Sequence, residues 1–168
     1  MISESSIKLD DIDREIINLI QSKPTITHTE ISKNVDRSQP TVGLRIKKLE
    51  EIGVLQYQAG VNVRVADLIF ARVEIQTNKP EKIIEIVKKC PFMLNAFRVS
   101  GNSNLSVLIA NSRLEHLDKI INCHFRNNPD VLTVHMDVIT EVVKDFVLPF
   151  DMTCENDCEC GLDVNCTF

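Results

Sequence analysis

The chain has 168 residues, of which 43% are hydrophobic and 26% charged, a composition typical of a folded globular protein and not of a disordered chain. The formal net charge of -5 comes from five acids in a C-terminal segment that lacks Lys and Arg, so it does not exclude a nucleic-acid partner for the rest of the chain. No apolar run approaches the roughly 20 residues that span a bilayer, and the N-terminus lacks the apolar core of a signal peptide. We therefore expect a cytoplasmic protein without membrane contacts.

The segment Leu9–Leu55 has the pattern of three short helices. In the first, apolar residues recur every three to four positions from about Asp10, and the pattern stops before Pro24. The second begins at Thr27, whose hydroxyl can form a capping box with Glu30 three residues later. These capping and periodicity patterns depend only on neighbouring residues, so the sequence predicts both helices and where each begins.

The third helix begins at Ser38 and runs to Leu49, with Pro40 tolerated in its first turn. Val42, Ile46 and Leu49 share one face, which predicts the side that packs against the other helices. Polar and basic residues flank or occupy the opposite face, where they could contact base edges and phosphates: Arg37, Ser38, Gln39, Thr41, Arg45, Lys47 and Lys48.

Three helices in this order, with the basic residues on the last, are typical of a helix-turn-helix that reads double-stranded DNA. The alternative is an amphipathic helical hairpin with a solvated charged face. Gly43 argues against a purely structural helix, because a mid-helix glycine costs about 1 kcal/mol relative to alanine and allows a close backbone approach.

Two short strands, Val54–Gln58 and Val61–Val65, are predicted after the third helix, joined around Ala59 and Gly60 as a wing or an exit hairpin. We therefore place a winged helix-turn-helix domain at residues 1–58 and a linker strand at residues 59–67.

A second domain is predicted at residues 68–148, where strand and helix patterns alternate. The expected elements are a strand at Ile69–Ile75, a helix from Asn78 to Cys90, strands at Leu94–Val99 and Leu105–Ala110, a helix from Ser112 to Phe125, and a strand at Val131–Val143. This βαββαβ order is that of a ferredoxin-like domain, so the fold class is α+β. With helices on one face of the sheet, the other face should be apolar and need cover, which predicts a homodimer.

The N-terminal residues resemble the Lrp/AsnC (feast/famine) regulators at Leu9, Asp10, Asp13, Ile16, Ile31, Val35, Ser38, Thr41, Val42, Arg45, Ile46, Leu49, Glu50, Gly53 and Val54. The second domain is similar to that family's effector-binding and dimerisation domain, so the resemblance covers about residues 9–145. It implies a transcription regulator whose dimer contacts DNA half-sites about 34 Å apart. It also implies assembly into tetramers, octamers or larger rings.

The resemblance places a small-molecule site near a Gly-x-x-Asp hairpin and a Thr on the last strand. Gly101 matches, but Asn104 stands at the acid and Met136 at the Thr, so the candidate effector-binding residues are Gly101, Asn104 and Met136. A neutral amide cannot pair with an ammonium as a carboxylate does, which favours a signal other than a free amino acid. The alternative is that Asn104 is a turn residue and Met136 a core residue.

The segment 149–168 is acidic and contains four of the six cysteines: Cys154, Cys158, Cys160 and Cys166. Four thiolates so close together can bind one Zn²⁺ or an iron–sulfur cluster such as 4Fe-4S, and the metal would supply the folding energy that burial cannot. We favour the cluster, because a regulator without an amino-acid pocket needs another input. The alternatives are a disordered tail and a pair of disulfides, and Cys90 and Cys123 read as buried helix residues.

The sequence therefore predicts a sequence-specific DNA-binding regulator that responds to redox state or metal through its tail. One alternative is an amino-acid-responsive regulator with a structural zinc or a disordered tail. Others are an architectural protein that coats DNA without sequence preference, and a thiol-redox or electron-transfer protein. Nothing in the sequence pairs a nucleophile with a base or forms a phosphate-binding loop, so we do not expect an enzyme.

Overall fold

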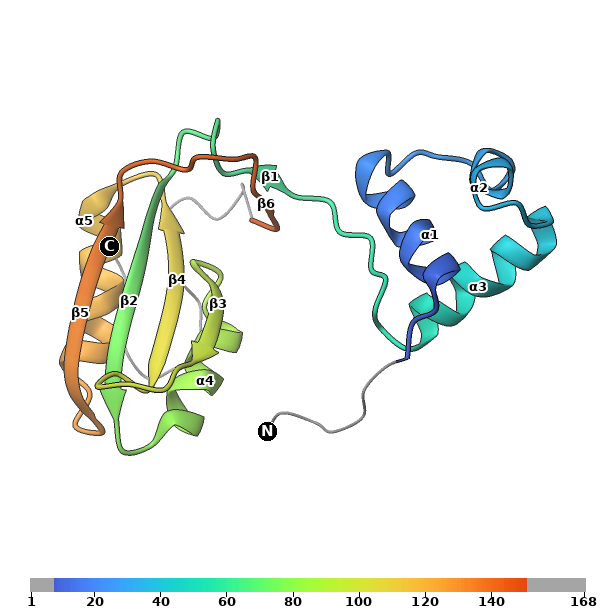
Figure 1. The fold of residues 1–168 in the computed structure, drawn as a ribbon. Helices are drawn as coiled ribbons and strands as arrows, with labels where there is room; N and C mark the ends of the chain where they lie inside the picture. The colour runs from blue at the N-terminus through green and yellow to red at the C-terminus, as the bar shows by residue number, and fades with distance from the viewer. Residues whose placement is uncertain (1–7, 151–168) are drawn as a thin grey trace. The chain divides into compact units, whose positions relative to one another are not determined.

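The computed structural model describes residues 8–150, which divide after Tyr57 into two compact units (Figure 1). The N-terminal unit contains α1 (Asp11–Ser22), α2 (His28–Asn34) and α3 (Gln39–Glu51). The predicted three helices are therefore confirmed.

Side-chain caps begin all three helices. The Asp13 backbone N–H donates to Asp10 at 2.8 Å and the Glu30 N–H donates to Thr27 Oγ1 at 3.2 Å, and both pairs complete capping boxes. Ser38 accepts from the Thr41 N–H at 3.4 Å. These bonds satisfy backbone donors that a helix start would otherwise leave without a partner.

The core of the N-terminal unit collects apolar residues from all three helices and from the segment after α3. Its buried members are Ile16, Ile20, Ile31, Val35, Val42, Ile46, Leu49 and Leu55. The chain leaves α3 through Gly53 at φ 73°, a left-handed conformation that costs glycine little. The Val54 N–H then donates back to the Leu49 carbonyl at 3.0 Å, which allows Leu55 to turn into the core.

The predicted wing hairpin is wrong. Residues 54–58 form no strand, and β1 (Val61–Asn62) pairs antiparallel with β6 (Val147–Leu148). Val63 explains the pairing, because it is buried in a small apolar cluster with Phe70 and Ala110 of the C-terminal unit. Burial of this side chain commits the strand to the second unit.

The C-terminal unit is an antiparallel sheet with strand order β3-β4-β2-β5. Its elements are β2 (Ile69–Thr77), α4 (Pro80–Lys89), β3 (Met93–Arg98), β4 (Leu105–Asn111), α5 (Leu114–Ile121) and β5 (Val131–Ile139). Figure 1 shows α4 and α5 on the same face of this sheet. The predicted α+β fold with a ferredoxin-like βαββαβ domain is confirmed.

Most boundaries in this unit differ from the prediction by one or two residues, and two differences are larger. The last strand ends at Ile139 instead of Val143, and α5 continues into a π-helical turn, η1 (Asn122–Arg126). None of the helices in the described part of the chain is long and apolar enough to cross a membrane.

The sheet face opposite the helices is charged at its centre, so the expectation of an apolar face was wrong. Ala71, Val73 and Ile75 pack in the core with the helices, and alternation along the strand turns Arg72 and Glu74 to the other face. Arg72 lies 3.3 Å from Glu74 and 3.2 Å from Asp137 of β5. At the Phe70 end, apolar residues of this same chain pack on the sheet: Val63, Leu68, Val142, Leu148 and Phe150.

Candidate nucleic-acid interface

The orientation of helix α3 is fixed by its apolar face, which is buried in the core, so the opposite face points outward. Val42, Ile46 and Leu49 are at most 5% exposed. Thr41, Leu44 and Lys48 follow one another at three- and four-residue spacing on the outward side and line one shallow depression with Lys8, Asp10, Asp13 and Arg45. The core therefore fixes which side chains of α3 a ligand would meet.

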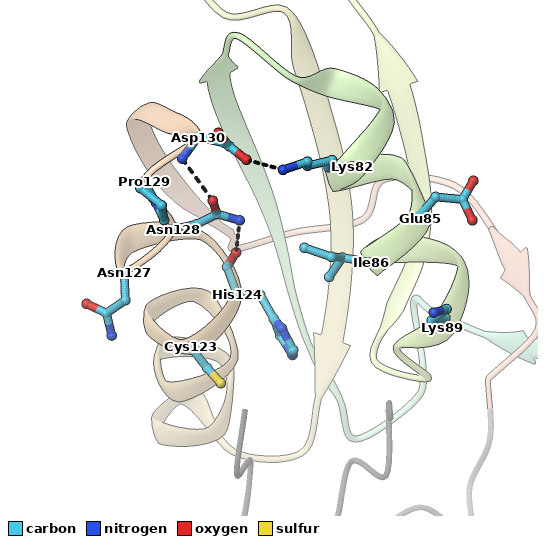
Figure 2. A pocket seen from close by; sticks show the side chains of 10 residues that line it. All are labelled: Lys82, Glu85, Ile86, Lys89, Cys123, His124, Asn127, Asn128, Pro129 and Asp130. Carbon is cyan, nitrogen blue, oxygen red and sulfur yellow. Dashed lines mark hydrogen bonds and ion pairs between the residues drawn. The ribbon is translucent and has the colours of Figure 1, made fainter. Parts of the chain in front are cut away.

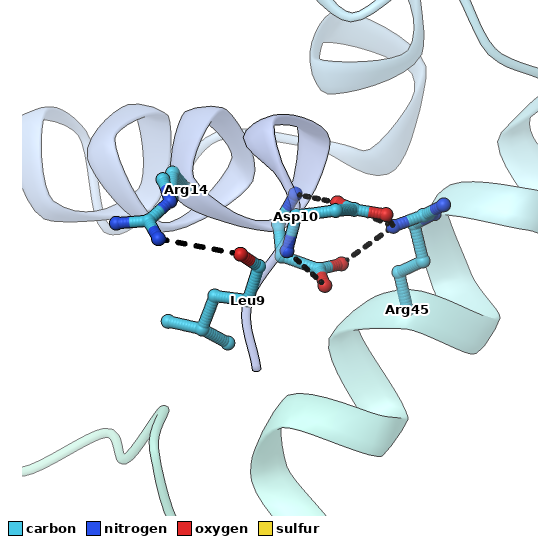
Figure 3. A network of polar contacts seen from close by, with 5 residues as sticks. Leu9, Asp10, Arg14 and Arg45 are labelled. Carbon is cyan, nitrogen blue, oxygen red and sulfur yellow. Dashed lines mark hydrogen bonds and ion pairs between the residues drawn. The ribbon is translucent and has the colours of Figure 1, made fainter. Parts of the chain in front are cut away.

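Arg45 is bound to two carboxylates from the start of α1 (Figure 3). Its Nη1 donates to Asp10 Oδ1 and Oδ2 at 2.9 and 2.7 Å and to Asp13 Oδ1 at 2.7 Å. The bond from the Asp13 N–H, followed by the bond from Arg45, lowers the pKa of Asp10, and the two carboxylates raise the pKa of Arg45. The same acids thus cap α1 and anchor α3.

These contacts change the electrostatics that the sequence suggested. No acid lies within the chain segment from Arg37 to Lys48, but folding brings two acids, 35 and 32 residues before Arg45, against it. The middle of the outward face is therefore not a purely cationic surface. Lys48 and Arg37, which form no ion pair with an acid in the described part of the chain, lie at the two ends of α3.

The other predicted DNA-binding residues surround this face. Arg37 is exposed and bonds the carbonyl of Asp36, which adopts φ 49° in the turn between α2 and α3. The Ser38 and Thr41 hydroxyls are 2.8 Å apart, and Lys47 lies 3.7 Å from Glu51. Gln39 and Lys48 are exposed. Arg37, Gln39, Lys47 and Lys48 are therefore all accessible on or next to α3.

Two features of α3 were missed or misread in the sequence. Leu44 is 71% exposed at the centre of the outward face, and its position between Thr41 and Lys48 could have revealed it. Gly43 faces α2, where an added Cβ would lie 3.5 Å from His28 Nδ1, an ordinary contact distance. No close backbone approach therefore requires this glycine.

The candidate effector residues do not converge on one site. Asn104 Nδ2 donates to the Thr77 carbonyl at 2.7 Å, and the Thr77 N–H donates to Asn104 Oδ1 at 3.1 Å, so the amide ties the β3–β4 loop to the end of β2. Met136 packs against the core between sheet and helices, opposite Val73 in the register. Gly101 is exposed in the β3–β4 loop. These contacts match the turn and core interpretations of Asn104 and Met136.

A groove of about 560 Å³ lies between α4 and η1, away from those residues (Figure 2). Ile86 reaches into it from α4, and Cys123 and His124 line it from η1. Cys123 is half-buried here, not fully buried as predicted, while Cys90 is buried. Burial lowers the pKa of His124, and Asp130 at the rim is held by Lys82 at 2.9 Å.

The four cysteines predicted to bind metal, Cys154, Cys158, Cys160 and Cys166, lie outside the described residues. Within residues 8–150, no group of three or more His, Cys, Asp or Glu side chains is arranged to hold a metal ion.

Comparison with known proteins agrees with both units. Residues 9–56 match the model for winged helix-turn-helix DNA-binding domains, and residues 68–148 match the model for the Lrp/AsnC ligand binding domain. An uncharacterized HTH-type transcriptional regulator of Pyrococcus horikoshii is 30% identical over 152 residues, which cover 83% of this chain and 92% of the relative. The chain belongs to the Lrp/AsnC family. It is therefore a DNA-binding transcriptional regulator and not an enzyme.

Solved structures share the fold of this Lrp/AsnC regulator. LrpC of B. subtilis superposes with a TM-score of 0.68 at 22% identity, covering 82% of this chain and 99% of LrpC. A transcriptional regulator of Neisseria meningitidis, solved as a complex with L-Met, gives a TM-score of 0.69 at 21% identity and covers 84% and 97% of the two chains.

Proposed function

We propose that this regulator binds specific operators through the outward face of α3, as a homodimer or a higher oligomer. The observation that carries the proposal is the placement of Thr41, Leu44 and Lys48 on one outward stripe, with Leu44 and Lys48 exposed and Thr41 half-buried, opposite a stripe that is buried. A helix held in this way can enter the major groove while its flanking cations contact phosphates.

Salt-dependent DNA binding tests the proposal. Lys48→Ala should weaken binding to all sequences and lower the slope of log K against log salt by about 1, because one phosphate contact is lost. Lys88→Ala removes an exposed lysine of α4 that pairs with Glu85 and is the matched control. Equal binding by the Lys48 variant and the control would contradict the assignment of α3.

Competition with random DNA separates a specific regulator from an architectural protein. We expect an operator selected from a random library to bind at least about 10³-fold more tightly than random sequence at physiological salt. Equal affinity for both would favour the DNA-coating alternative.

We further propose that the signal enters through the cysteine-rich tail. The support is the cluster of four cysteines in the sequence, together with the use of Asn104 and Met136 for contacts within the fold. Bound metal would be an iron–sulfur cluster or Zn²⁺, held by thiolates of Cys154, Cys158, Cys160 and Cys166. The cluster or the Zn²⁺ would stay bound to the protein as a cofactor and would not be consumed.

Metal and acid-labile sulfide analysis of anaerobically purified protein tests this part. Iron with sulfide, lost in a Cys158→Ser, Cys160→Ser variant, would support a redox input, and zinc alone would support a structural brace. Absence of both from the wild-type protein would contradict a metal-linked signal.

An amino-acid effector is the second candidate input, because the matched domain is a ligand-binding domain and the Neisseria meningitidis relative was solved with L-Met. Thermal melting of this protein with single amino acids distinguishes the two inputs. A ligand at 100 times its Kd would stabilise the folded state by about 2.7 kcal/mol.

A further inference from the structure

Leu44 is a large apolar side chain at the centre of a face that is otherwise polar. It is 71% exposed, and it lies three residues after Thr41 and four before Lys48 on α3. A single exposed leucine is ordinary on a protein surface. Its position is informative because the buried stripe of α3 directs it away from the core.

Polar side chains beside Leu44 are engaged within the protein. Arg45 Nη1 is bound to Asp10 and Asp13, and the Thr41 and Ser38 hydroxyls share a hydrogen bond of 2.8 Å. An arginine reads guanine with two N–H groups at once, and with Nη1 anchored only the Nη2–Nε edge of Arg45 is left for such a fork. The carboxylates beside it also face any approaching guanine O6 and N7, which are acceptors and not donors.

We propose that Leu44 reads the C5-methyl group of a thymine, so that each operator half-site carries an A·T pair opposite the middle of α3. This inference rests on the proposed function. The methyl group is the one apolar group that a base pair presents in the major groove, and it distinguishes thymine from the other bases. Contact would remove the methyl group and part of Leu44 from water together.

Deoxyuridine substitution isolates this contact, because deoxyuridine pairs as thymine does but lacks the methyl group. An operator is selected from a random library with the wild-type protein, and its thymines are replaced by deoxyuridine one at a time. Burial of one methyl group predicts about a fourfold loss of affinity at one position in each half-site. The Leu44→Ala variant should bind the thymine and deoxyuridine operators equally, as in a double-mutant cycle.

Ile52→Ala is the matched control, because Ile52 is a 42% exposed apolar residue at the end of the same helix. The Ile52→Ala variant should lose as much affinity as the wild-type protein when the thymine is replaced by deoxyuridine. The inference is overturned if no thymine substitution weakens wild-type binding, or if the Leu44→Ala variant remains sensitive to the same substitution.

The experiment distinguishes failure of the proposed function from failure of the proposed role of Leu44. Wild-type protein that does not distinguish the selected operator from random DNA would overturn the proposed specific function and this inference with it. Specific binding that is insensitive to deoxyuridine would overturn the role of Leu44 alone.

Discussion

Arg45 Nη1 lies 2.7 Å from Asp13 Oδ1, so an arginine of α3 is tied to a nearly buried carboxylate of α1. The Asp13 side chain is 10% exposed and that of Arg45 is 28% exposed. Removing one partner of a pair with this little solvent contact costs more than breaking a surface ion pair, and this pair joins α1 to α3. Arg45 therefore positions the interface whether or not its remaining nitrogens contact DNA.

Arg45→Ala should lower the free energy of unfolding of the N-terminal unit by about 1–2 kcal/mol, because Asp10 and Asp13 would lose the hydrogen bonds from the guanidinium. The midpoint of urea unfolding, followed by helical circular dichroism, measures this loss. Arg14→Ala is the control, since Arg14 is exposed and makes one long bond of 3.4 Å to the Leu9 carbonyl. Equal midpoints for the two variants would contradict the bracing role.

Acid should destabilise α2 through Glu30. Bonds from Lys23 and then from Thr27 lower the pKa of Glu30 to about 2 from its ordinary 4.5. Because the folded-state pKa is the lower one, the stabilisation is fully present above about pH 4.5 and is lost as the pH falls toward 2.

Glu30→Gln should therefore unfold at lower denaturant concentration at pH 7 but show a shallower loss of stability between pH 4.5 and 2. Thermal melting across this range makes the comparison. Glu15→Gln, at an exposed acid of α1, controls for loss of a surface charge. An unchanged acid dependence in the Glu30 variant would contradict the capping and ion-pair role.

Gly60→Ala should disrupt the β1–β6 pair. An added Cβ would lie 2.4 Å from the Leu148 carbonyl oxygen, and backbone cannot move aside cheaply. We expect a loss of about 1–3 kcal/mol and faster exchange of the Val63 amide, which donates to the Phe146 carbonyl.

Gly101→Ala is the control for that variant, because its added Cβ would have 3.8 Å to the nearest atom, the Ser103 carbonyl oxygen. Hydrogen exchange followed by NMR reports on the Val63 amide directly. Retained protection in the Gly60 variant would show that the two short strands do not depend on this close approach.

Gly43→Ala should raise stability by about 0.5–1 kcal/mol, because alanine suits a helix interior better and His28 leaves room for the methyl group. Operator affinity should not change, since position 43 faces α2. Urea unfolding and operator titration measure the two effects. A loss of affinity at unchanged stability would place this backbone at the DNA after all.

Sequence and structure agree wherever a signal is local. Asp10, Thr27 and Ser38 identify the helix starts because each cap bonds a backbone donor within three residues. The ferredoxin-like order was also predictable, because each strand and helix has its own hydrophobic period.

Contacts between distant segments were not predictable. The wing was assigned to residues 54–65 by proximity, whereas Val61 pairs with Leu148. Asn104 was named from its place in the family's hairpin pattern, and its bonds to the Thr77 backbone, 27 residues away, could not be read from the sequence. The centre of the open sheet face was expected to be apolar, but cross-strand neighbours place Asp137 beside Arg72.

The sequence by itself determined the helices, the order of the strands, the family and the face of α3 that is buried, because periodicity and capping act over one or two turns. Only the tertiary structure decided that Arg45 is anchored by two acids and that β1 joins the C-terminal unit. These outcomes depend on which surfaces exclude water together, and that is settled by packing between segments remote in the chain.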